Sequence, residues 1–303
     1  MFSKASKLSI KNWRQKWGLI FVMPAILGFL IFTLVPMISS LIISFTNYRV
    51  VAQTVNFVGI DNYLRFFDGR DFYIKKSLFV TFYYVALSIP LCMFTAFMLA
   101  MLLNKDIKGK SIFRTIYYLP TIVPVVATSL IWTWLLDPDL GLINLVLRQL
   151  NLPTSKFIFA EKTVIPSLAF MSVWTCGGTM VIFLAGLQGV SRTLYEAVEI
   201  DGGNAWNKFR NITIPMMTPT IFYNFVMGII GGLQTFTQGY IMTNGGPNNG
   251  SLFIVFYLYR EAFRDQEMGR ASAIAWVVFI IIVCITALVF RSSKSWVYYE
   301  GDN

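Results

Sequence analysis

Six long runs without Asp, Glu, Lys or Arg constrain this 303-residue chain more than any other feature. A helix needs about 20 apolar residues to cross the roughly 30 Å hydrocarbon core of a bilayer, and each run can supply them. The runs are Gly18–Tyr48, Ser77–Asn104, Thr115–Leu136, Thr163–Ser191, Asn211–Tyr259 and Ala271–Phe290. We therefore predict an all-α polytopic membrane protein with six transmembrane helices.

The fifth run is too long for one helix. Pro215 and Pro219 lie near its start, and residues 244–250 have the turn-forming sequence Asn-Gly-Gly-Pro-Asn-Asn-Gly. We predict one span at about 218–243. Residues 251–259 are too few to cross, so they are interpreted as an interfacial or partly buried helix, with a seventh span as the alternative.

The distribution of basic residues predicts that both termini are cytoplasmic. Five Lys or Arg precede the first run, and the connections after the second and fourth runs are densely basic. The first run far exceeds the apolar region of a signal peptide, so we expect it to remain as an anchor. The predicted organisation, in a plasma (inner) membrane, is a cytoplasmic N-tail at 1–17, a membrane domain at 18–291 and a cytoplasmic C-tail at 292–303.

Composition excludes several classes of function. Charged residues are 13% of the chain, about half the usual ~25%, and the mean hydropathy is +0.61. Because there is no histidine, Ser-His-Asp catalysis, Cys-His catalysis and histidine metal sites are excluded. We predict no enzymatic activity, no metal and no cofactor on this chain. The net charge of +10 is explained by the membrane surface, so no nucleic-acid partner is expected.

Residues 193–215, between the fourth and fifth spans, have the pattern of two short helices joined by a turn. Thr193 and Glu196 have the spacing of a capping box. Asp201-Gly202-Gly203 is expected to end the first helix, since glycine adopts the left-handed cap conformation freely. Asn204 is expected to cap a second helix that ends at Pro215. The side chains predicted to project from it are Trp206, Phe209 and Ile212.

The spacing in this segment resembles the EAA loop of ABC importer permeases. That pattern is E-A-A, three residues, G, nine residues, then I-x-L-P, and this chain departs from it at Val198 and Ile214. The resemblance implies that the segment is a coupling helix that docks on an ATPase subunit. The residues that it assigns to coupling are Glu196, Ala197, Asp201, Gly202, Ile212 and Pro215. The alternative is purely local: Glu196 caps its helix and Gly202 ends it.

Further segments resemble carbohydrate-importing permeases of the maltose, glycerol-phosphate and raffinose type. They are Leu233–Pro247, Tyr257–Phe263, Phe57–Tyr63 and Phe113–Pro120, and the resemblance extends from about residue 15 to 290. It implies that the chain forms half of the translocation pathway of an ATP-driven sugar importer. The implied partners are a second homologous permease, two ABC ATPase subunits that carry ATP and Mg, an extracytoplasmic sugar-binding protein and membrane lipid.

A sugar path is predicted between spans four and five. A sugar needs hydroxyl-matching donors and acceptors inside a largely apolar wall. The candidates are Ser172, Trp174, Thr175, Cys176, Thr179, Gln234, Thr235, Gln238 and Tyr240. Neutral polar groups fit an uncharged glycan better than a sugar phosphate. The alternative is that Gln234 and Gln238 join helices by hydrogen bonds.

Two rival readings are weighed. Asn104–Ser111 is one glycine short of a P-loop and follows a predicted span rather than a strand, so we expect ATP hydrolysis on a partner. An ion-coupled secondary transporter is the alternative function. Such carriers usually keep a charged residue within the membrane, and all six runs lack one.

Overall fold

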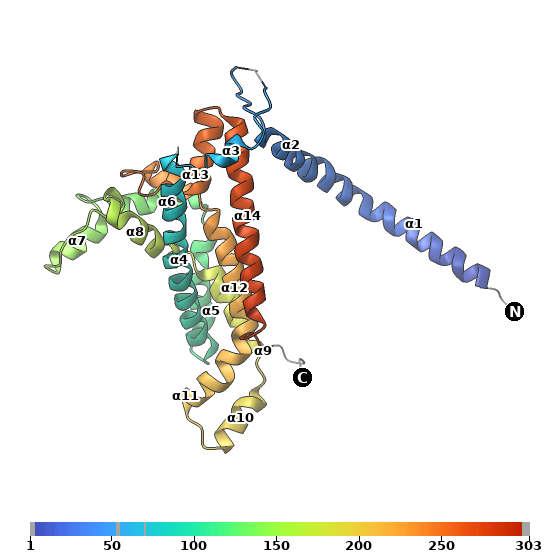
Figure 1. The fold of residues 1–303 in the computed structure, drawn as a ribbon. Coiled ribbons are helices and arrows are strands. Elements are labelled where there is room, and N and C mark those ends of the chain that lie inside the picture. Colours follow the sequence, from blue (N-terminus) through green and yellow to red (C-terminus); the bar gives the residue numbers. More distant parts are fainter. Residues whose placement is uncertain (1–3, 53–54, 70, 299–303) are drawn as a thin grey trace. The chain divides into compact units, whose positions relative to one another are not determined.

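The computed structural model describes residues 4–52, 55–69 and 71–298, which are largely helical with no β-strand among them (Figure 1). The chain divides into two compact units, which are treated separately below. The first comprises Met1–Leu64 with Glu261–Trp276, and the second comprises Arg65–Arg260 with Val277–Asn303.

The first unit contains a long apolar helix near the N-terminus. Helix α1 (Lys4–Phe29), the π-helical turn η1 (Leu30–Leu34) and α2 (Val35–Ser44) follow one another without a break. The described side chains from Trp17 to Ser44 are mostly exposed within the unit, as expected for a segment that faces lipid or another chain. After α2, the side chain of Asn62 in α3 (Asp61–Leu64) donates 2.9 Å hydrogen bonds to the backbone carbonyls of Ser44 and Thr46.

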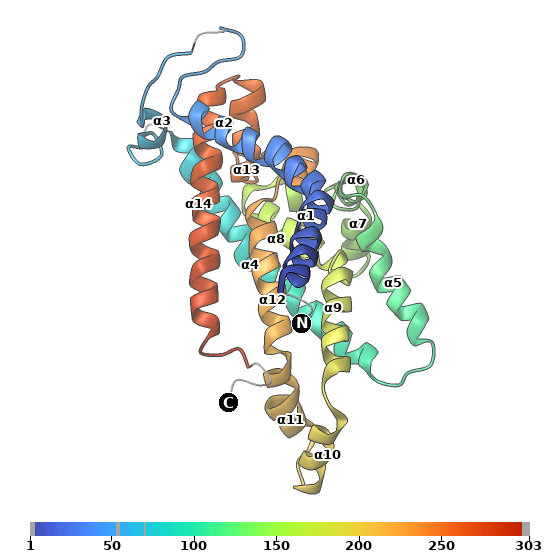
Figure 2. The same cartoon turned by 90° about the vertical axis from the view of Figure 1, so that its right-hand side faces the viewer.

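Helix α4 (Phe72–Asn104) lies at the centre of the second unit (Figure 2). Its first turn is capped by Asp71, whose carboxylate accepts hydrogen bonds from the backbone N–H groups of Tyr73 and Ile74 and from the Tyr257 hydroxyl. The next helices are α5 (Lys110–Ile122), α6 (Val125–Leu135), α7 (Leu142–Gln149), η2 (Phe157–Phe159), α8 (Glu161–Trp174) and α9 (Gly177–Gly189).

The rest of the second unit includes the predicted helical loop. The elements are α10 (Arg192–Ile200), α11 (Ala205–Lys208), η3 (Phe209–Thr213), α12 (Ile214–Leu233), η4 (Gly239–Thr243), α13 (Ile254–Tyr259) and the second half of α14 (Met268–Ser293). η5 (Arg260–Arg264) follows α13. Both views show α10 and α11 projecting at one end of this unit, opposite α13 (Figures 1 and 2).

The core of the second unit is built on α4. Ala96 and Ala100, one turn apart, let α9 approach closely, and Phe97 packs edge-on against Phe183 with ring centroids 5.3 Å apart. Nearer α13, Gly228 and Gly232 of α12 lie against the side chains of Ile89 and Val85. Small residues at a spacing of four therefore allow both close contacts of α4, as in other membrane helix pairs.

Four of the six predicted spans are long, apolar helices, and the other two are bent pairs. The continuous ones are Trp17–Ser44, Phe72–Asn104, Ala205–Leu233 and Met268–Ser293. The third span is broken between α5 and α6, which meet at 98°, and the fourth between α8 and α9, which meet at 51°. The prediction of six spans is met if each bent pair counts as one.

Three local predictions were wrong. The fifth span is not helical over 218–243, because α12 ends at Leu233 and a short irregular stretch precedes η4. Pro215 does not end the preceding helix. It lies inside the continuous helix Ala205–Leu233, just after the π-helical turn η3, where the shifted backbone hydrogen-bond pattern tolerates the missing N–H of proline. The third wrong prediction is the capping box at Thr193, since Ser191 is the N-cap of α10.

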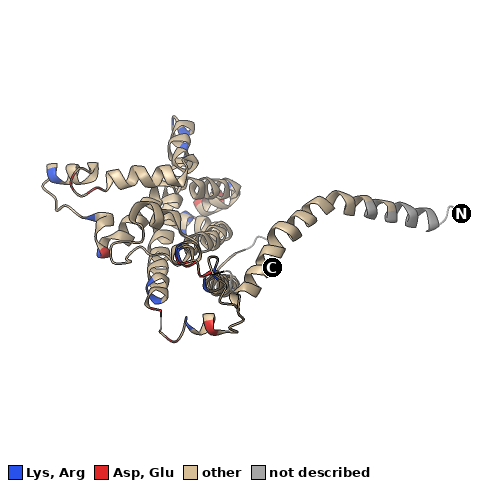
Figure 3. Ribbon diagram, turned by 90° about the horizontal axis from the view of Figure 1, so that it is seen from above, with Lys and Arg blue, Asp and Glu red and all other residues tan. Residues whose placement is uncertain are grey.

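Charged residues avoid the spans. Figure 3 shows most of the ribbon without charge, and the Lys, Arg, Asp and Glu positions lie mainly on loops and near helix ends. The short helix α13 buries Ile254, Phe256 and Tyr257. The segment 251–259 therefore contains a short buried helix, which is one of the two predicted alternatives. Its six helical residues are too few to cross a membrane.

Candidate functional site

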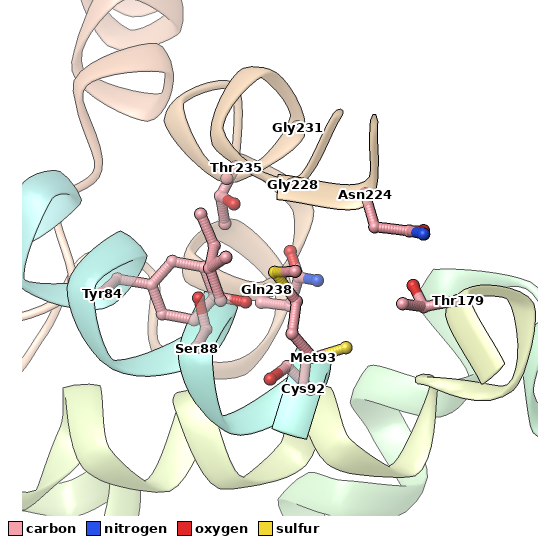
Figure 4. A pocket seen from close by; sticks show the side chains of 13 residues that line it. Tyr84, Ser88, Cys92, Met93, Thr179, Asn224, Gly228, Gly231, Thr235 and Gln238 are labelled. Carbon is pink, nitrogen blue, oxygen red and sulfur yellow. The ribbon is translucent and has the colours of Figure 1, made fainter. Parts of the chain in front are cut away.

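A polar cavity of about 260 Å³ lies among α4, α8, α9, α12 and the stretch that follows α12 (Figure 4). We call it the polar cavity. Its polar side chains are Tyr84, Ser88, Cys92, Ser172, Thr179, Asn224, Thr235 and Gln238. The apolar part of the lining is Ile89, Met93 and three glycines. No charged side chain is present among these described lining residues.

The end of α12 explains how polar groups reach this depth. After Leu233 the helix stops, so Thr235 and Gln238 leave the regular helix and turn toward α4 (Figure 4). Gly231 has no neighbouring atom within 4 Å of where a Cβ would lie, so its missing side chain leaves open space. Beyond the break, Gly239 is packed so tightly that a Cβ would lie 2.8 Å from the backbone carbonyl of Ser251.

The wall formed by α4 holds its polar groups in fixed positions. The side chain of Tyr84, a buried residue, lies beside those of Ser88 and Thr235 in the cavity lining (Figure 4). The Tyr84 ring packs edge-on against Phe253 at 5.2 Å. Across the cavity, the Asn224 amide donates to the carbonyl of Thr220 at 2.8 Å, which orients its side chain. The cavity therefore presents hydroxyls and amides on a largely preformed frame.

Four of the nine predicted path residues meet in this cavity: Ser172, Thr179, Thr235 and Gln238. The other five do not line it. Thr175 and Gln234 are exposed residues at the C-terminal ends of α8 and α12. Tyr240 instead joins an aromatic cluster, with its ring 5.3 Å from Phe236 and 5.6 Å from Tyr259.

The remaining two, Trp174 and Cys176, line a separate cavity of about 320 Å³, which we call the apolar cavity. It lies where α5 and α6 meet α8. The Trp132 ring is 6.2 Å from both Phe170 and Trp174, in edge-on geometry. The two cavities are neighbours, because Cys92 of the polar cavity lies next to Cys176 of the apolar cavity.

Sequence reasoning missed the contribution of α4 and the one polar residue that α12 contributes, Asn224. Tyr84, Ser88 and Cys92 recur every four residues and so share one face of α4. A polar stripe of this kind within a charge-free run could have indicated that this face of the helix lines a cavity. Asn224 is an amide between Tyr223 and Phe225 in the fifth run, and nothing near it in the sequence distinguishes a cavity residue from one that joins helices.

In the loop 191–215 the first predicted short helix forms as α10, with a different cap, and the second is the start of the continuous helix Ala205–Leu233. The Ser191 side chain, not Thr193, accepts the capping hydrogen bond, from the Thr193 N–H at 3.3 Å. The capping-box prediction was therefore wrong, because α10 begins two residues earlier. Gly202 has φ +74°, which glycine adopts without strain, and Asn204 caps α11 through the Asn207 N–H at 3.0 Å.

The residues assigned to coupling are unevenly exposed. Glu196, Ala197, Asp201 and Gly202 are exposed on α10 and the turn, whereas Ile212 and Pro215 are half-buried. Ile200 and Trp206 add two exposed apolar side chains at 86% and 63%. Of the three side chains predicted to project from the second helix, only Trp206 is exposed, and Phe209 packs inward beside Phe97 at 6.5 Å.

Comparison with known proteins identifies the family. A family model described as "Binding-protein-dependent transport system inner membrane component" matches residues 76–295. A Bacillus subtilis protein named "Probable ABC transporter permease protein YesP" is 40% identical over 288 residues, which are 94% of this chain and 92% of that protein. The chain belongs to this family. The resemblance to ABC importer permeases is thus confirmed.

Other relatives and solved structures agree. The "Arabinooligosaccharides transport system permease protein AraP" of Bacillus subtilis is 32% identical over 93% of this chain and 89% of its own length. A chain in the crystal structure of a bacterial alginate ABC transporter, in complex with an alginate pentasaccharide-bound periplasmic protein, matches with a TM-score of 0.82. It is 22% identical, and the match covers 94% of this chain and 96% of that chain. The shared fold is that of ABC importer permeases.

Proposed function

We propose that this chain is a permease subunit of an ATP-driven importer and that its polar cavity carries an uncharged carbohydrate. The observation that supports the proposal is the lining itself. Each sugar hydroxyl both donates and accepts hydrogen bonds, and the cavity offers hydroxyls and amides that do the same. A lining with neither acidic nor basic side chains among its described residues suits a neutral glycan better than a sugar phosphate.

The relatives support this substrate class. Two of them are named for arabino-oligosaccharides and for multiple sugars, with 32% and 31% identity to this chain. An ion-coupled carrier, the rival function, would need a charged group along its path. The described lining of the polar cavity supplies none.

The loop 191–215 is proposed to be the coupling loop, which docks on an ATPase subunit. Support comes from its exposed Glu196 and Ala197, from the turn at Gly202, and from two exposed apolar side chains that a partner surface would cover. This requires the loop and both termini to be cytoplasmic. The assembly would contain a second permease, two ATPase subunits that hold ATP and Mg, and an extracytoplasmic sugar-binding protein.

In the proposed cycle, the binding protein delivers sugar from outside and ATP binding closes the ATPase subunits. The coupling loop transmits that closure to the spans, which expose the polar cavity alternately to the two sides. This chain would provide only half of the pathway, since Tyr84, Thr179, Asn224 and Gln238 line a cavity of one permease and would surround only one side of a sugar. The second permease would complete it.

The test compares two adjacent tyrosines of α4. In proteoliposomes that contain the whole transporter and its binding protein, uptake of labelled arabino-oligosaccharides, maltose and lactose is measured for Tyr84→Phe, Gln238→Ala and the control Tyr83→Phe. Tyr83 stacks on Phe79 at 6.0 Å and does not line the cavity. We expect the two cavity variants to lose sugar affinity several-fold, because each removes a hydrogen-bonding group worth about 0.5–1.5 kcal/mol.

The control variant is expected to transport normally. Wild-type affinity and selectivity in both cavity variants would place the sugar elsewhere. Loss of uptake with normal binding-protein-stimulated ATPase activity would support the assignment.

A further inference from the structure

Helix α10 is tied to the base of α12 by a short relay of hydrogen bonds. The Tyr195 hydroxyl lies 3.1 Å from the Thr213 hydroxyl, 18 residues further along the chain. Thr213 is buried and donates its own proton to the backbone carbonyl of Lys208 at 3.4 Å. Its oxygen therefore accepts from Tyr195, and the relay runs from Tyr195 through Thr213 to Lys208.

Lys208 also makes the second tie. Its ammonium group pairs with the Glu199 carboxylate, which connects α11 to α10. An exposed ion pair contributes little to stability in water. Here, however, the Lys208 side chain is only 24% exposed. The ion pair joins α10 to Lys208, the same residue whose backbone carbonyl ends the hydrogen-bond relay.

The second half of the loop is fixed to the membrane domain by aromatic packing. Phe209 lies between Trp206 and Phe97, with ring centroids at 5.5 Å and 6.5 Å, and Phe97 packs on Phe183. These contacts link α11 and η3 to the core of α4 and α9. Between α10 and this fixed part, the backbone turns at Gly202, where a side chain would meet no atom within 4 Å.

Gly202 itself makes no side-chain contact at this turn, whereas Gly203 packs against the Val198 side chain and its N–H donates to the Val198 carbonyl at 2.8 Å. The exposed acid Glu196 lies on α10, before the turn. Because glycine backbone is easily deformed, cross-links between α10 and the residues after the turn limit how far α10 can move without α12. We propose that Tyr195 and Lys208 are positioning residues that brace the turn, so that displacement of α10 reaches α12. This inference rests on the proposed coupling role of the loop.

The test separates bracing from docking. The whole transporter carrying Tyr195→Phe, Thr213→Val or Lys208→Glu is purified with its ATPase subunits and reconstituted with the binding protein. Two quantities are measured: the amount of ATPase that co-purifies, and the ATP hydrolysed per sugar transported. We expect normal co-purification and an increase of about three- to tenfold in ATP per sugar, the effect of losing one net hydrogen bond or ion pair.

Conservative variants distinguish a brace from a general structural effect. Thr213→Ser keeps the hydroxyl and should couple normally, and so should Tyr223→Phe, a control tyrosine exposed on α12. The charge exchange Glu199→Lys with Lys208→Glu should restore the ratio that either single variant loses. A wild-type ratio in Tyr195→Phe and Lys208→Glu, or no rescue by the exchange, would overturn the brace.

Failure of the underlying proposal would give a different result. If Glu196→Lys and Gly202→Pro leave both ATPase co-purification and transport unchanged, the loop does not dock, whatever the brace variants do.

Discussion

Gly177 lies directly against the backbone carbonyl of Tyr117, at the point where two bent spans meet. Gly177 begins α9 immediately after the 51° bend, and Tyr117 lies in the second half of α5, five residues before the helix ends at Ile122 and the chain turns by 98° into α6. A Cβ on Gly177 would collide with the Tyr117 carbonyl and would lie 2.9 Å from the Tyr118 Cα. The two bends therefore hold each other in place through backbone contact.

Gly177→Ala should destabilise the protein because backbone atoms cannot move aside as a flexible side chain can. We expect a loss of about 1–3 kcal/mol, typical of overpacking, measured as a lower unfolding temperature of the purified transporter and lower abundance in the membrane. Gly178→Ala is the matched control, since its Cβ would make only an ordinary 3.5 Å contact with Thr121. Equal stability of the two variants would contradict the backbone contact between Gly177 and Tyr117.

Cys92 should report occupation of the polar cavity. It is half-buried and lines the cavity, whereas Cys284 is exposed on α14. In a variant that keeps Cys92 as its single cysteine, a small methanethiosulfonate reagent should inhibit transport, and saturating sugar should slow the labelling. A variant that keeps only Cys284 should label at one rate with or without sugar. Sugar-independent labelling of Cys92 would argue against sugar binding beside it.

The orientation predicted from basic residues can be measured directly. In a background without native cysteines, single cysteines are placed at Lys108 and Asn207, expected inside, and at Leu140 and Asn248, expected outside. An impermeant thiol reagent added to intact cells should label only the second pair, because the membrane shields the first. Labelling at 207 from outside would place the proposed coupling loop on the wrong side for an ATPase.

The sequence was sufficient to predict the spans, but not their bends. Charge-free runs identify the membrane segments because a charged group in hydrocarbon is costly, whatever the local geometry. The break after α5 does have a signal in Pro124, which caps α6 and prevents α5 from continuing. The bend angles have no such signal in the sequence, because they depend on the contact between Gly177 and Tyr117, which lie in distant segments of the chain.

The candidate site was predictable only in part for the same reason. Thr235 and Gln238 stand out as polar residues in an apolar run, and the structure brings them together with Ser172 and Thr179. Trp174 lies two residues after Ser172 but in the apolar cavity, because residues two apart on a helix do not share a face. The stripe of Tyr84, Ser88 and Cys92 becomes meaningful only once α4 is known to face α12.

The last described residues anchor the C-terminal segment to the first turns of α12. The Trp296 ring packs edge-on against Phe222 at 5.9 Å, and the Tyr298 backbone N–H donates to the Thr218 hydroxyl at 2.9 Å. Trp296→Ala should detach this segment, because it removes an aromatic contact worth about 0.5–1.5 kcal/mol beyond its buried area.

Thr218→Val should have a smaller effect of the same sign, through loss of the hydrogen-bond acceptor. Tyr298→Phe is the control, because the bond uses the backbone of Tyr298 and survives the change. Protease sensitivity of the C-terminus and the unfolding temperature of the purified transporter are the measurements. We expect faster cleavage and a lower unfolding temperature in Trp296→Ala than in Tyr298→Phe. The anchored segment contacts α12 one to two turns beyond Pro215. If this contact helps to fix the base of α12, releasing the segment should also change the ATP hydrolysed per sugar transported. An unchanged ratio would limit the role of the C-terminal segment to stability.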